Sequence, residues 1–111
     1  MIQKKINDLV WEIAIAPSTN PELIVDGTAR AGTTWLMQQK IYLSEELNKN
    51  TSRSIIAHEL THAFICSTQI KEEESYTEEE LCEFVAKWGD KIFALTDEIY
   101  NELYCNKPIK D

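Results

Sequence analysis

The chain of 111 residues contains only two histidines, few cysteines and no long apolar run. Its three cysteines, Cys66, Cys82 and Cys105, are odd in number and show no CxxC spacing. The sequence therefore supports neither a disulfide framework nor a zinc ribbon, and we expect free thiols in a reducing compartment. Since no stretch reaches the length required to cross a bilayer, we expect no membrane partner.

Basic residues are also scarce, with 11 Lys and Arg against 19 Asp and Glu and a net charge of −8. This balance argues against nucleic acid as a partner, because binding to phosphates relies on Lys and Arg to replace counterions. The basic start at Lys4 and Lys5 is followed by Asn7, Asp8 and Glu12, which interrupt any apolar signal segment. We expect a soluble, cytoplasmic protein with a single domain over residues 1–111.

The first half of the chain predicts one helix followed by short strands. Apolar residues at helical spacing predict an amphipathic helix over residues 2–13, but the alternation of Trp11, Ile13 and Ile15 leaves a strand open at its end. Residues 23–43 are rich in strand-forming residues and predict two to four short strands in a small sheet.

The second half of the chain predicts a long C-terminal helix. Thr77 is expected to cap its first turn, with Glu80 completing a capping box. Apolar residues then keep helical spacing to about Tyr104. The fold class that follows is α+β, with a small mixed or antiparallel sheet, a helix around residues 55–65 and the long C-terminal helix.

Both histidines lie in the stretch IIAHELTHAFI, residues 55–65, which is otherwise almost wholly apolar. Residues four apart share a face of a helix, so His58 and His62 present two imidazoles side by side, with Glu59 next to the first. This HExxH spacing is the zincin metalloprotease motif, in which two nitrogen ligands bind one Zn²⁺ and the carboxylate handles the protons of the attacking water. A chance match is expected in roughly a few chains per thousand of this length.

A catalytic zinc site needs a third protein ligand, and no further His or paired Cys is available downstream. A carboxylate from the helix that begins near Thr77 is the natural supplier. We favour Glu79 because Glu80 is engaged in the capping box, and because Glu83, four residues on, would fix the tautomer of a ligating imidazole. Glu78 stays open, since it lies nearer the middle of the apolar stripe.

These residues carry a resemblance to the gluzincin metallopeptidases. HELTH at 58–62, followed by a helix with acidic residues at 79 and 83, resembles the minigluzincins and also the ImmA/IrrE-type peptidases of phages and mobile elements. The similarity covers residues 40–88, and it implies a zincin-like fold that holds zinc. It also implies that an edge strand within Thr28–Leu43 holds an extended peptide or protein substrate by backbone pairing.

The resulting hypothesis is hydrolysis of a peptide bond, with Glu59 as the general base and Zn²⁺ as the cofactor. Negative charge on the carbonyl oxygen requires an electrophile, for which the sequence offers Tyr76, Tyr100, Tyr104 or Arg53 without choosing among them.

A second class of function stays open, namely a zincin-like binding or regulatory module that keeps zinc without turnover. Such a module would be catalytically silent, or autoinhibited by the N-terminal segment or by the tail Asn106–Asp111 lying in the cleft.

Overall fold

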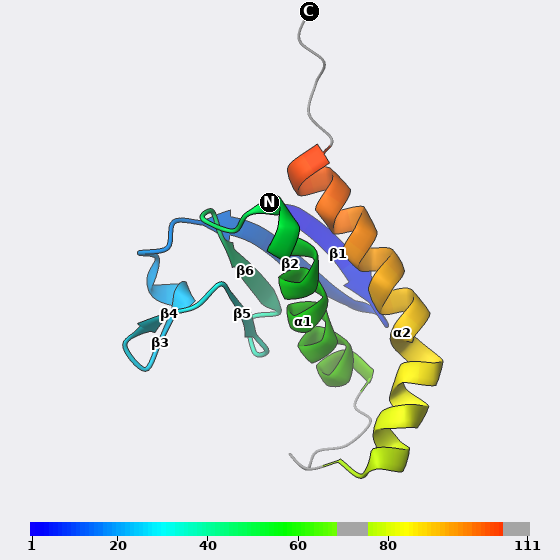
Figure 1. Cartoon of the computed structure of the whole chain (residues 1–111). Coiled ribbons are helices and arrows are strands. Elements are labelled where there is room, and N and C mark those ends of the chain that lie inside the picture. The colour runs from blue at the N-terminus through cyan, green and yellow to red at the C-terminus, as the bar shows by residue number, and fades with distance from the viewer. Residues whose placement is uncertain (69–75, 106–111) are drawn as a thin grey trace, which may run out of the picture.

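The computed structural model describes residues 1–68 and 76–105, which form an α+β fold (Figure 1). The strands are β1 (Ile2–Ile6), β2 (Leu9–Ala16), β3 (Ile24–Val25), β4 (Thr28–Ala29), β5 (Gly32–Trp35) and β6 (Lys40–Ser44). The helices are α1 (Lys49–Thr68) and α2 (Glu78–Tyr100), with a short 3₁₀ turn at Pro21–Leu23 and a π-helical turn at Asn101–Cys105.

The main sheet has four strands in the order β1-β2-β6-β5, and its pairing is mixed. The β1–β2 and β5–β6 pairs are antiparallel, whereas β2 and β6 run parallel. Strands β3 and β4 form a separate two-stranded sheet. The predicted class and the long C-terminal helix are confirmed, and β5 is an edge strand within the predicted window.

The prediction of an N-terminal helix over residues 2–13 was wrong, because this segment forms the β1–β2 hairpin. The chain reverses at Asn7 and Asp8, which adopt left-handed φ angles of 46° and 73°. A two-residue turn of this kind matches the twist of paired strands, and Asn and Asp tolerate the left-handed region. Apolar residues at both helical and alternating spacing fit either structure, and Asn7 and Asp8 were the local signal for a turn.

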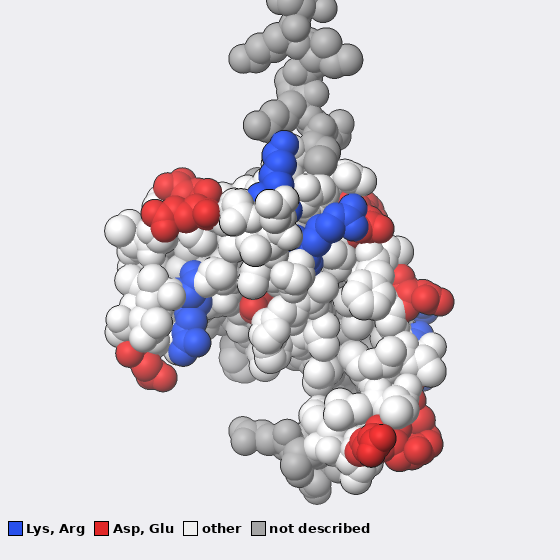
Figure 2. All heavy atoms as spheres, viewed as in Figure 1, with Lys and Arg blue, Asp and Glu red and all other residues white. Residues whose placement is uncertain are grey.

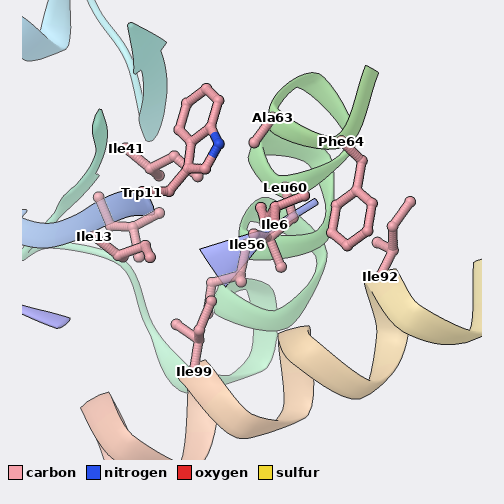
Figure 3. Close-up of a cluster of buried hydrophobic side chains, with 11 residues drawn as sticks. Ile6, Trp11, Ile13, Ile41, Ile56, Leu60, Ala63, Phe64, Ile92 and Ile99 are labelled. Atoms are coloured by element: carbon pink, nitrogen blue, oxygen red, sulfur yellow. The ribbon is translucent and has the colours of Figure 1, made fainter. Parts of the chain in front are cut away.

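Both helices cover the same face of the main sheet, and the core lies between them (Figures 1 and 3). Trp11 and Ile13 of β2 contribute to it from the sheet, and Leu60 and Phe64 contribute from α1 (Figure 3). The buried cluster consists of Ile6, Trp11, Ile13, Ile41, Leu43, Ile56, Leu60, Ala63, Phe64, Ile92 and Ile99. Burial of this apolar surface is what places α1 over the sheet.

Polar contacts fasten both ends of α1. Asn48 accepts a hydrogen bond from the backbone N–H of Thr51 at 2.9 Å and so caps the first turn. At the other end, the indole N–H of Trp11 donates to the Ser67 hydroxyl at 2.8 Å, and the Asn7 side chain donates to the Ser67 carbonyl at 3.0 Å. The HExxH helix is therefore held at both termini.

Helix α2 begins with the predicted capping box, in which Thr77 and Glu80 exchange hydrogen bonds of 3.2 Å. Near its other end, Lys4 of β1 contacts Glu98 at 2.5 Å and Glu102 at 2.9 Å. Partial burial lowers the pKa of Lys4, but its hydrogen bonds to the two carboxylates outweigh this effect and raise it.

Among the described side chains, Cys66 and Cys82 are free thiols, while the side chain of Cys105 lies outside the described part. No helix over residues 1–68 and 76–105 is long and apolar enough to cross a membrane.

Candidate metal centre and substrate groove

His58 and His62 project from the same side of α1, as their spacing predicts. Both side chains are exposed, and their ring centroids lie 5.1 Å apart at an interplanar angle of 75°. Among the described residues, neither imidazole makes a side-chain hydrogen bond, although Nε2 of His58 lies 3.9 Å from a carboxylate oxygen of Glu59. Two ring nitrogens are therefore available to one ion.

Glu59 differs from His58 and His62 in being buried, with 6% of its surface exposed. Its Oε1 accepts a hydrogen bond of 2.6 Å from the hydroxyl of Thr34 on β5. A buried carboxylate requires such a partner, because its charge is costly to remove from water. The hydrogen bond therefore holds the carboxylate in one position beside His58. Sequence reasoning missed Thr34, and no local pattern marked it.

Strand β5 approaches α1 closely at Gly32. A Cβ atom added there would lie 3.1 Å from Cγ of Glu59 and 3.1 Å from Cγ2 of Ile55, which is tighter than ordinary van der Waals contact. Glycine inside a strand often marks such an approach of another chain segment. Gly32 thus allows the edge strand to lie directly beside the Glu59 side chain.

A groove of about 390 Å³ lies between β5 and α1, and both histidines and Glu59 line it. Val25, Arg30, Gly32, Thr33, Thr34, Trp35, Leu36, His58, Glu59 and His62 line it. The predicted motif and the predicted edge strand therefore meet in one cavity. Arg30 adds a cation that sequence reasoning did not single out.

A second cavity, of about 310 Å³, lies between α1 and α2 and is almost wholly apolar. Its walls include Thr61 and Ile65 of α1 with Phe84 and Ile92 of α2. His58, Tyr76 and Glu80 also line this apolar cleft. The His58 side chain thus borders both cavities.

The predicted third ligand is not brought to the two histidines. Glu79, Glu78 and Glu83 are exposed on α2 and line neither the groove nor the apolar cleft. Within residues 1–68 and 76–105, no three His, Cys, Asp or Glu side chains form a metal-binding group. Glu80 is the acidic residue of α2 that shares a cavity with His58, although its Oε1 takes part in the capping box. The assignment of Glu79 stays a prediction.

None of the four electrophile candidates lines the groove. Arg53 pairs with Asp97 and lies over the ring of Tyr100, 4.7 Å from its centroid. The Tyr104 hydroxyl is buried without a hydrogen-bond partner in the described part, and burial raises its pKa. Tyr76 lines the apolar cleft.

The N-terminal segment does not cover the groove. It forms β1, which lies at the opposite edge of the sheet from β5. The structure therefore does not place this segment where it could block the groove. The tail Asn106–Asp111 lies outside the described residues.

Comparison of the chain with family models, with curated proteins and with solved structures gave no match. Two adjacent imidazoles that line one groove supply two nitrogen donors, which suits zinc, and the Glu59 carboxylate is held by Thr34 beside them. Among the described residues, no third protein ligand for the metal lies with these two imidazoles.

Proposed function

We propose that this chain is a zinc-dependent metallopeptidase that hydrolyses peptide bonds. The observation that carries the proposal is the position of Glu59, whose buried carboxylate is held by Thr34 beside two exposed imidazoles in one groove. A site that only stored zinc would have no use for a carboxylate oriented in this way. When bound, zinc supplies a Lewis acid that polarises the scissile carbonyl and makes water acidic.

In this mechanism the chain's own residues position the reactants and move one proton. His58 and His62 would hold the metal at the mouth of the groove. The Glu59 carboxylate takes a proton from the attacking water and later delivers it to the leaving amine. The edge of β5 that is not paired with β6 offers backbone groups to an extended peptide, and would align it beside Glu59.

The hydrogen bond from Thr34 yields a direct prediction for Thr34→Val. This change keeps the shape of the side chain but removes the donor to the Glu59 carboxylate, so kcat should fall by about 10- to 100-fold. Thr34→Ser, which retains a hydroxyl, should recover most of the rate. The measurement is hydrolysis of a quenched fluorescent peptide by both variants, and equal rates for Val and Ser would contradict the positioning role.

Metal content tests the site itself. We expect about one zinc per chain by elemental analysis, and His62→Ala should lose it because only one imidazole then remains. Glu79→Ala, Glu78→Ala and Glu80→Ala, measured side by side, should show which carboxylate of α2 completes the set. Asp90→Ala, an exposed acidic residue further along α2, is the matched control.

Failure to take up zinc in the wild type would refute the metal centre. Zinc at one equivalent without cleavage of any protein or peptide offered would instead favour the alternative, a zincin-like binding or regulatory module. This second function is favoured by one observation: among the described residues, no third protein ligand for zinc lies with the two histidines.

A further inference from the structure

We propose that Arg30 binds a carboxylate of the peptide substrate, within about two residues of the bond that is cleaved. This inference rests on the proposed function, and it names the class of substrate. The position of Arg30, its lack of an ion pair within the described residues and the charge around the groove each contribute to it.

The backbone at Arg30 is held in place on both sides. The β3–β4 hairpin turns at Asp26 and Gly27, which have φ angles of 51° and 77°. Beyond this hairpin the N–H of Arg30 donates to the carbonyl of Leu23 at 2.8 Å, and Leu23 is fully buried. The next carbonyl, that of Ala31, accepts from the backbone of β6 at 2.9 Å. Arg30 therefore enters the groove from a fixed position.

The guanidinium of Arg30 has no carboxylate partner among the described residues, whereas several other cations do. Lys4 and Arg53 pair with carboxylates of α2, and Lys40 pairs with Glu12. Glu59, the acidic residue among those that line the groove, is held by Thr34 and forms no ion pair with Arg30. Arg30 and Glu59 thus give the groove one basic and one acidic side chain, and the basic one forms no ion pair in the described part of the chain.

The net charge of the whole protein is opposite in sign to the charge of Arg30. With a net charge of −8, the surface disfavours acidic peptides at long range. On the face shown in Figure 2, most acidic side chains lie at its ends and edges, and basic side chains lie between them among uncharged atoms. Charges further than about 8 Å away are largely screened at physiological salt, so a guanidinium in direct contact dominates recognition. Its planar fork matches a carboxylate with two parallel hydrogen bonds.

The reach of Arg30 defines where the substrate carboxylate must lie. Arg30 precedes Gly32 by two residues, and Gly32 lies beside the Glu59 side chain. A peptide aligned on β5 would then place its carboxylate about two residues from the scissile bond, because both chains advance by a similar rise per residue. Such a carboxylate comes either from an Asp or Glu side chain or from the C-terminus of the peptide.

Binding to the Glu59→Gln variant separates this inference from turnover. The full chain is supplied with zinc, and fluorescence anisotropy measures N-terminally labelled hexapeptides of alanine and leucine. In the first series the C-terminus is amidated, and a single Glu or Gln is placed at successive positions. The second series compares peptides that have a free C-terminus with peptides that have an amidated one. We expect carboxylate-bearing peptides to bind about 10- to 100-fold more tightly, and Arg30→Gln to abolish that preference.

The controls match the change in charge. Lys5→Gln removes one positive charge from an exposed position of β1, at the far edge of the sheet, and should leave the preference intact. Arg30→Lys keeps the charge without the fork and should restore part of it. A preference for Glu over Gln identifies an acidic side chain as the source, and a preference for the free end identifies the C-terminus.

Equal binding across the peptides, no measurable binding by any of them, or a preference that persists in Arg30→Gln would each overturn the inference. Carboxylate-dependent binding that needs Arg30, found together with a wild type that cleaves nothing, would refute the peptidase proposal alone. If the wild type cleaves, Arg30→Gln should raise KM for the preferred peptide while kcat changes little.

Discussion

Glu59→Gln should lower the rate of peptide hydrolysis by about a thousandfold while the protein keeps its zinc. Glutamine has nearly the same shape, and its amide oxygen can still accept the hydrogen bond from Thr34. It cannot take up a proton at neutral pH, so the general-base contribution of about 10²- to 10⁴-fold disappears. The two histidines are untouched, which leaves metal binding in place. Cleavage of a quenched peptide and elemental analysis of the same sample provide the measurement.

Glu45→Gln is a suitable control, because Glu45 is an exposed acidic residue outside the groove and its replacement makes the same change in charge. It should cleave at the wild-type rate. Activity retained in Glu59→Gln would show that Glu59 is not the base. Equal loss of zinc and activity would show instead that Glu59 acts through the metal or the fold.

Trp11→Ala should lower the free energy of unfolding by about 3–5 kcal/mol, the range found when large aromatic residues are removed from cores. Trp11 is fully buried in the cluster between the sheet and α1 (Figure 3). Its indole also ties β2 to the end of α1 through Ser67. Domains of this size have a total stability of about 5–15 kcal/mol, so the loss is large. Urea unfolding followed by circular dichroism measures it.

Trp11→Phe separates packing from the hydrogen bond. It keeps most of the apolar volume but removes the N–H, so we expect a loss of about 1–3 kcal/mol. Ser67→Ala removes the other partner, and the double variant should lose less than the sum of the two single changes. A Trp11→Ala protein within 1 kcal/mol of the wild type would contradict the placement of this side chain in the core.

Local sequence signals were sufficient to predict helices α1 and α2. The capping box at Thr77 and Glu80 satisfies backbone N–H groups within four residues, so it requires no tertiary information. The pairing of His58 with His62 follows in the same way from the periodicity of a helix. Both features depend on residues close together in the chain.

The N-terminal hairpin shows where such reasoning was insufficient. The apolar residues of 2–13 fit a helix and a pair of strands equally well, and the choice depends on partners elsewhere. Strand β2 pairs with β6, about 28 residues further along the chain from Glu12 to Lys40, and Trp11 packs under α1. These non-local contacts stabilise the strands, and propensity alone could not reveal them.

The sequence by itself determined helices α1 and α2, the α+β class and the adjacent imidazoles with their carboxylate, because these depend largely on local spacing. Only the tertiary structure decided which residues surround Glu59. Thr34, Gly32 and Arg30 reach it from a strand that the chain folds back beside α1, and burial of the shared core sets that position. The same packing leaves Glu79 of α2 exposed to solvent, while Phe84 lines the apolar cleft between α2 and α1.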